Sequence, residues 1–82
     1  MIKPNYKAAK YFLDITGDRC PMTFVKTRLM LDKMPPGEQL GVRLKGEEPL
    51  RNVPRSAKEL GCDVSEPCLI EGDIYEISIQ KP

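Results

Sequence analysis

The chain has 82 residues, with 13 basic and 12 acidic side chains, three cysteines and no histidine. This length is enough for one small domain with a thin core, so an active site has to be built at the surface. The balanced charge provides no strong field for nucleic acid or membrane binding, and no apolar run is long enough to span a membrane. The lack of histidine excludes Cys-His catalysis and Cys/His zinc sites, and we expect neither a metal nor an organic cofactor.

The three cysteines bear on the compartment and on redox chemistry. Their odd number, together with the absence of an apolar leader after Lys3, predicts a cytoplasmic protein with reduced thiols. Cys62 and Cys68 fit the common role of a free cysteine as a small buried hydrophobic side chain. In the alternative, one of them resolves Cys20 into an intramolecular disulfide, or the two pair with each other. Such a bond needs Cα atoms within about 7 Å.

The first part of the chain predicts a strand followed by a helix. We interpret residues 1–10 as a loose leader, because they show no hydrophobic period. Residues 11–16, YFLDIT, form a predicted strand with the odd-numbered side chains on one face. After a turn at residues 17–19, a helix begins at Pro21, and the sequence PPG ends it near Met34. The side chains expected on its buried face are Phe24, Thr27, Leu31 and Met34, with Val25 beside them.

The middle of the chain predicts a second strand and a second helix. Residues 38–45, EQLGVRLK, alternate as a half-buried strand. Its inward side chains are expected to be Leu40, Val42 and Leu44. Residues 46–49, GEEP, are a predicted loop, and Asn52 is a suitable cap for a helix that ends at Gly61. The buried stripe expected on this helix is Val53, Ala57 and Leu60.

The C-terminal part predicts two more strands. A third strand begins near Cys62, is interrupted at Glu66–Pro67 and resumes at residues 68–70. Residues 71–73, EGD, form a tight turn, and residues 74–80, IYEISIQ, are a fourth strand. The inward side chains of this last strand are expected to be Tyr75, Ile77 and Ile79.

The predicted order of elements is therefore βαβαββ. Two crossovers followed by a terminal hairpin place both helices on the same face of one sheet. We predict an α/β protein, a two-layer α/β sandwich in which two helices cover one face of a mixed four-stranded sheet. Residues 1–82 are expected to form a single domain.

Cys20 stands at the start of the first predicted helix, where thiol chemistry changes most. With Pro21 as the first helical residue, Cys20 is the cap, and the N–H groups of Met22 and Thr23 are expected to lack helical acceptors and point toward its sulfur. The positive end of the helix dipole and the adjacent Arg19 also favour the thiolate. A surface thiolate without a base suits sulfur exchange.

Two further interpretations concern the surroundings of this thiol. In the structural alternative, Asp18 caps the helix and Cys20 is an ordinary residue of the first turn. Lys26 and Arg28, about two turns from the sulfur, are candidate partner-docking residues. Together with Arg19 and Arg51 they would form a basic rim that favours an acidic partner surface.

A resemblance to a known family is carried by the segment DITGDRCPMTFVKTRLMLDKMPPGEQLGVRL. It resembles the signature of the TusA/SirA/YedF family of small sulfur-carrier proteins, in which Cys-Pro-x-Pro opens a helix and Pro-Gly-Glu precedes a strand. The residues in register without gaps are Asp14, Gly17, Cys20, Pro21, Leu31, Pro36, Gly37 and Glu38. Further on, VPRSAKELGCDV and YEISIQK resemble the second helix and the last strand of the family, so the resemblance covers residues 11–81.

The resemblance implies both a function and a site. In that family the cysteine carries sulfane sulfur as a persulfide, which it accepts from a cysteine desulfurase or rhodanese-type donor and hands to a cysteine of an acceptor protein. Cys20 would be the catalytic, persulfide-bearing residue of a sulfurtransferase-type carrier. Pro21 would start the activating helix, and Thr23 and Arg19 would support the thiolate. The partners implied are a sulfur-donor protein and a sulfur-acceptor protein. No binding to a membrane is expected.

The chain departs from the family signature at Thr23, where the second proline of Cys-Pro-x-Pro is expected. Thr23 restores a backbone N–H and adds a hydroxyl. We therefore predict that the Cys20 thiolate is at least as well stabilised as in the two-proline form, although the loop is less rigid.

A second hypothesis belongs to a different class of function. The same fold would serve as a non-catalytic regulatory module that binds a protein or RNA through its helix face, with Cys20 incidental. The near-neutral charge and the lack of exposed aromatic platforms argue against direct nucleic acid binding. Loading of one sulfur atom onto Cys20 separates the two hypotheses.

Overall fold

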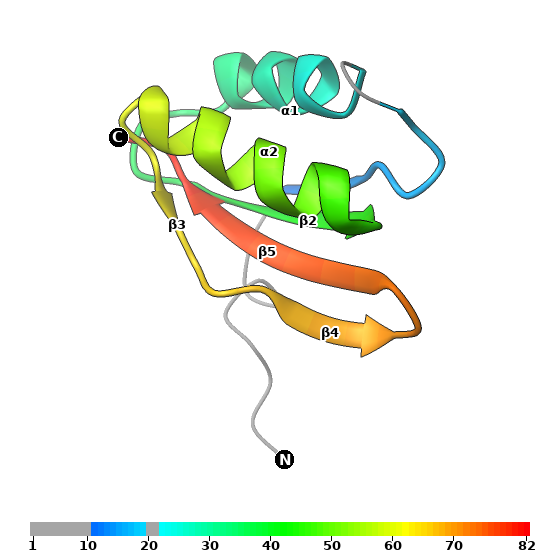
Figure 1. Ribbon diagram of the computed structural model, residues 1–82. Coiled ribbons are helices and arrows are strands. Elements are labelled where there is room, and N and C mark those ends of the chain that lie inside the picture. The colour runs from blue at the N-terminus through cyan, green and yellow to red at the C-terminus, as the bar shows by residue number, and fades with distance from the viewer. Residues whose placement is uncertain (1–10, 20–21) are drawn as a thin grey trace.

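Two helices lie on one face of a mixed sheet in the computed structural model (Figure 1). The structure describes residues 11–19 and 22–82, so the predicted leader, residues 1–10, and the pair Cys20–Pro21 lie outside the described residues. The elements in chain order are β1 (Tyr11–Asp14), α1 (Met22–Lys33), β2 (Gln39–Lys45), α2 (Glu47–Glu59), β3 (Asp63–Val64), β4 (Cys68–Glu71) and β5 (Ile74–Gln80). This arrangement confirms the predicted α/β class and the two-layer architecture.

The sheet has the order β1-β2-β5-β3, and β4 also pairs with β5. β1 is parallel to β2, whereas β2, β3 and β4 are all antiparallel to β5. β3 and β4 pair with successive parts of one β5 edge, with Val64 opposite Ile79 and Cys68 opposite Glu76. The fourth position of the predicted sheet is thus filled by two short strands. The break contains Pro67, which has no N–H to donate to a strand ladder.

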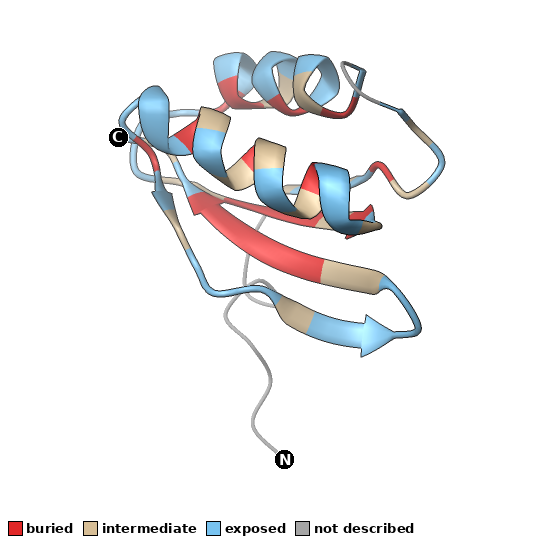
Figure 2. Cartoon of the chain, in the orientation of Figure 1, coloured by how far each residue is buried: buried red, intermediate tan, exposed pale blue. Residues whose placement is uncertain are grey.

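The core lies between the sheet and the two helices, where the buried faces meet (Figure 2). Its buried hydrophobic members are Ile15, Leu31, Met34, Leu40, Val42, Leu44, Val53, Ala57, Cys62, Ile77 and Ile79. The inward alternation predicted for β2 and for the end of β5 is confirmed, because the even residues of β2 and the odd residues of β5 face each other in register. Glu76 and Ser78 are buried as well, so β5 is covered on both faces.

The second helix begins earlier than the sequence pattern indicated. α2 starts at Glu47, so Asn52 is not its cap, and the predicted loop at residues 46–49 contains its first turn. Gly46 adopts a φ of 90°, which turns the chain into the helix and favours glycine. Pro49 is tolerated in the first turn because no helical acceptor is needed there.

The end of α2 is where the sequence placed it. Gly61 has a φ of 90° and its N–H donates to the carbonyl of Lys58, while the N–H of Cys62 donates to Ala57. This is the pair of bonds that closes a Schellman motif, and it confirms Gly61 as the residue that ends the helix. The expectation that Leu60 is buried is wrong, since 38% of it is exposed.

Candidate functional site

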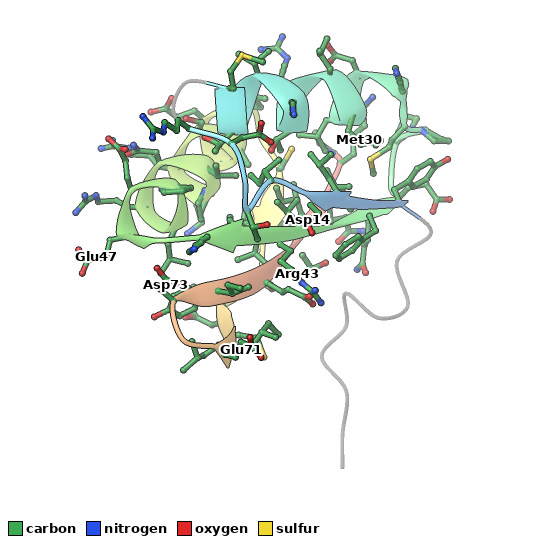
Figure 3. All side chains as sticks on the ribbon, turned by 90° about the vertical axis from the view of Figure 1, so that its right-hand side faces the viewer. Asp14, Met30, Arg43, Glu47, Glu71 and Asp73 are labelled. Carbon is green, nitrogen blue, oxygen red and sulfur yellow. The ribbon has the colours of Figure 1, made fainter. Side chains whose placement is uncertain are left out.

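Local hydrogen bonds shape the loop that follows β1. Oδ1 of Asp14 accepts hydrogen bonds from the backbone N–H of Thr16 at 2.9 Å and from its hydroxyl at 2.7 Å. The N–H of Asp18 donates to the carbonyl of Ile15 at 3.1 Å. The Thr16 N–H, then its hydroxyl and the charge of Arg43, hold the pKa of the Asp14 carboxyl below its ordinary value. Figure 3 shows Asp14 at the end of β1, so the chain leaves this strand through a defined turn.

Two interactions connect this loop to α1 across the positions of Cys20 and Pro21. The N–H of Thr23 donates to the carbonyl of Arg19 at 3.2 Å. The Nζ of Lys26 lies 2.8 and 3.0 Å from the two carboxylate oxygens of Asp18. The Thr23 N–H therefore has a backbone acceptor, and the expectation that it lacks one is wrong.

The buried face of α1 is built from threonines as well as apolar residues. Thr23, Thr27 and Leu31 are buried at a spacing of four residues, and Met34 continues the row. The Thr27 hydroxyl donates to the Thr23 carbonyl at 2.8 Å, which satisfies it inside the core. The Thr23 side chain is 1% exposed and faces the interior. The expectation that Phe24 belongs to this buried face is wrong, because it is only half-buried.

Three apolar side chains form an exposed row on the opposite side of α1. Met22, Val25 and Leu29 are 46%, 39% and 56% exposed. Their spacing of three and four residues places them on one face, and we name them the α1 stripe. The row starts two residues after Cys20. Sequence reasoning places Val25 beside the buried face and so misses this row, although the apolar residues at positions 22, 25 and 29 share one face of a helix.

The basic residues expected around Cys20 are mostly paired within the chain. Lys26 pairs with Asp18, and Nε of Arg28 lies 3.5 Å from Asp32 one turn further along α1. Arg19 is exposed and borders an open crevice of about 390 Å³. The crevice is lined by Asp18, Arg19, Lys45, Gly46, Glu47, Glu48 and Pro49. Figure 3 shows Glu47 where β2 passes into α2. The predicted basic rim is therefore a surface of mixed charge.

The other two cysteines lie away from the start of α1. Cys62 is buried and lines a small cavity with Leu31 and Asp32, near the far end of α1. At 1.5 Å per residue, Leu31 stands about 13 Å along the helix from Met22, which argues against pairing of Cys62 with Cys20. Burial raises the pKa of the Cys62 thiol and keeps it protonated. This agrees with the structural role predicted for Cys62.

Cys68 occupies a different part of the sheet. It lies in β4, which is separated from β1 by β2 and β5. Neighbouring strands are about 4.8 Å apart, so β4 lies about 14 Å from β1, the strand that precedes Cys20 in the chain. This distance argues against a disulfide between Cys68 and Cys20. Cys68 is half-buried, and no disulfide joins it to Cys62 in the part of the chain that the structure describes.

Residues 11–19 and 22–82 show neither a metal site nor a membrane-crossing helix. In these ranges, no cluster of three or more histidine, cysteine or acidic residues is arranged to hold a metal ion. Neither α1 nor α2 has the length and apolar character that a membrane-crossing helix requires.

Comparison with solved structures supports the fold. A SirA-like protein from Desulfitobacterium hafniense has a similar structure, with a TM-score of 0.74 over 84% of this chain and 93% of that protein. The two sequences are 18% identical, so the likeness concerns the fold.

Comparison of sequences supports the family. A protein of Archaeoglobus fulgidus is 45% identical over 56 residues, which cover 68% of this chain and 64% of that protein. A protein of Thermotoga maritima is 37% identical over 54 residues, which cover 66% of this chain and 68% of that protein. Both are named as candidate sulfur carrier proteins, and this chain spans slightly less than two thirds of the first. The model of the family described as Sulfurtransferase TusA matches residues 11–81, so the chain belongs to the TusA family.

Proposed function

We propose that this protein is a cytoplasmic sulfur carrier that holds sulfane sulfur as a persulfide on Cys20. Membership of the TusA family and the names of its relatives support a carrier role. The structural observation behind the proposal is the tied loop before α1, in which Arg19 bonds to Thr23 and Asp18 to Lys26 on either side of Cys20. These two bonds join the described residues before Cys20 to the described residues after it, and this supports the proposal.

The chemistry is an exchange between sulfur atoms that needs no added oxidant. The Cys20 thiolate attacks the outer sulfur of a persulfide on the donor protein, a desulfurase or a rhodanese-type enzyme. A new S–S bond forms on Cys20, the S–S bond of the donor breaks, and the donor cysteine leaves as a thiolate. In the second step an acceptor cysteine attacks the outer sulfur of the Cys20 persulfide, and Cys20 returns as a thiolate.

The dipole of α1 and the neighbouring Arg19 favour the thiolate that this exchange requires. α1 has 12 residues, which is long enough for a positive potential at its first turn. The exposed Arg19 adds a full positive charge one residue before Cys20. Thr23 supports the site by anchoring the start of α1. Its side chain is buried in the core, and its N–H donates to the Arg19 carbonyl in the loop.

The α1 stripe is the surface that we assign to partner docking. It begins two residues after Cys20 in the chain and continues along the exposed side of α1, so a protein that brings its own cysteine to Cys20 is expected to contact these apolar side chains. Exposed apolar rows next to a reactive group are typical of protein interaction sites.

Loading by a cysteine desulfurase tests the proposed function. The protein is incubated with the desulfurase and cysteine, and its intact mass is recorded with and without reductant. We expect one added sulfur atom that is lost on reduction. Cys20→Ser should abolish the adduct, whereas Cys62→Ser and Cys68→Ser should retain it. If no desulfurase or rhodanese-type donor loads the wild type, the non-catalytic binding module is the better description.

A further inference from the structure

The ion pair between Asp18 and Lys26 takes no part in the bond-making steps of the sulfur exchange, but it joins the loop before α1 to that helix. Asp18 lies two residues before Cys20, and Lys26 lies in the second turn of α1, six residues after it. Both carboxylate oxygens are within 3.0 Å of Nζ, so the pair connects the loop directly to the helix. The exposed fractions are 44% for the lysine side chain and 22% for the aspartate side chain.

The position of Asp18 is unfavourable for a neighbouring thiolate. The Cα atoms of residues 18 and 20 are at most about 7 Å apart in any conformation, so their side chains leave the backbone close together. A negative charge at this distance opposes ionisation of Cys20. The ammonium group of Lys26 contacts the carboxylate and compensates its charge.

The remaining charges around Asp18 do not replace this compensation. The crevice bordered by Asp18 presents two cations and two further carboxylates: Arg19, Lys45, Glu47 and Glu48. These four charges sum to zero. Among the described residues, Lys26 is the cation that makes an ion pair with Asp18.

We propose that Asp18 and Lys26 are positioning residues for Cys20, whose ion pair ties the loop to α1 and cancels a carboxylate charge beside the thiolate. This inference rests on the proposed role of Cys20 as the sulfur-carrying thiol. The bond between Thr23 and Arg19 ties the same loop through the backbone, but only the side-chain pair also sets the local charge.

The charge role is tested by the pKa of the Cys20 thiol in Asp18→Asn, in Lys26→Met and in the double variant. Alkylation by iodoacetamide is followed against pH at 0.1 M salt, and modification is quantified on the tryptic peptide that contains Cys20. A unit charge about 7–10 Å from a thiol in water-like surroundings changes its pKa by about 0.3–0.5, which is a two- to threefold change in thiolate fraction. Lys26→Met should raise the thiol pKa, Asp18→Asn should lower it, and the double variant should return close to wild type.

The tether role is tested by native-state proteolysis. Trypsin cleaves after Arg19, inside the tied loop, and cleavage requires the loop to open. Loss of an exposed ion pair should accelerate this cleavage about two- to fivefold in both single variants and in the double variant. The charge role therefore predicts pKa changes of opposite sign in the two single variants. The tether role predicts faster cleavage in both of them.

The neighbouring pair Arg28–Asp32 is a matched control on the same helix. Arg28 and Asp32 lie about 9 and 15 Å along the helix from Met22, near or beyond the Debye length of about 10 Å at 0.1 M salt. Arg28→Met and Asp32→Asn should therefore change the pKa of Cys20 less than the Asp18 and Lys26 variants do. The charge role would be overturned if Asp18→Asn and Lys26→Met shifted the pKa of the Cys20 thiol in the same direction, or if neither variant changed it. Unchanged cleavage after Arg19 would overturn the tether. Neither measurement involves sulfur loading, so a failure of the proposed function is detected separately.

Discussion

Asp14 gives the turn after β1 a dependence on pH. Its carboxylate accepts two hydrogen bonds from Thr16, and the folded protein therefore favours the charged form, with a lowered pKa. A carboxyl of this kind contributes stability that is present above its unfolded pKa and is lost as the pH falls through the folded pKa. The turn before Cys20 should thus weaken in acid.

Asp14→Asn tests this effect, because the amide keeps an acceptor but not the charge. At pH 7 we expect the variant to lose about 0.5 kcal/mol of unfolding free energy, a small value because the carboxyl is exposed. The difference between the two proteins should shrink as the pH is lowered below about 4, where the unfolded carboxyl becomes protonated. Urea titrations over a pH series measure it, and a difference that is constant with pH would contradict the assignment.

At the scale of elements, α1 has two faces with different tasks. Thr23, Thr27 and Leu31 pack against the core, and the α1 stripe faces solvent. A helix needs one apolar face to fold onto a sheet, so a second exposed apolar row requires another explanation. Because this row begins two residues after Cys20, contact with a sulfur donor is the explanation that we propose.

The double variant Val25→Ser/Leu29→Ser tests the docking role. We expect the KM for the desulfurase in the loading assay to rise about tenfold, the effect of removing an apolar anchor from a protein interface. Alkylation of Cys20 by a small reagent and thermal stability should change little, since both side chains are exposed.

Leu69→Ser is the matched control for the α1 stripe. Leu69 is 57% exposed, almost equal to Leu29, but it lies in β4, away from α1. If Leu69→Ser and the double variant raise the KM equally, the effect is not specific to α1 and the docking assignment is wrong.

At the scale of the whole molecule, β5 joins both parts of the sheet and is buried on both faces. Arg43 is labelled in Figure 3. On the face away from the helices, its Nε and Nη2 both contact Oε2 of Glu76, a residue that is 1% exposed. The guanidinium also lies 5.7 Å from the ring centre of Phe12 on β1. One arginine of β2 therefore connects three strands.

Arg43→Met should destabilise the protein strongly, because it leaves the Glu76 carboxylate buried without its cation. We expect a loss of about 3 kcal/mol, the usual cost of breaking a buried ion pair. An 82-residue domain has about 4–12 kcal/mol in total, so the loss is measurable by thermal or urea unfolding. The variant Arg43→Met/Glu76→Met should be more stable than Arg43→Met alone, and an equal or lower stability would contradict the argument.

Several features of this protein follow from the sequence by itself. The alternation of β2, the inward isoleucines of β5, the end of α2 at Gly61 and the break at Pro67 depend on near neighbours in the chain. The hydrophobic period of a strand, the missing N–H of a proline and the positive φ of a glycine are local properties. A pattern of residue types therefore indicates them directly. The residues in register from Asp14 to Glu38, taken together, indicated the family from the sequence, and the family model matches residues 11–81.

Tertiary structure decided which surfaces meet. It placed Thr23 inside and Val25 outside, paired Lys26 with Asp18, and separated Cys62 from the start of α1. It also buried Glu76 against Arg43, although the alternation of β5 assigns Glu76 to the solvent face. A face of a helix or strand becomes interior only when another element covers it, and an ion pair forms only when two segments approach. The spacing of residues along one element determines neither of these conditions.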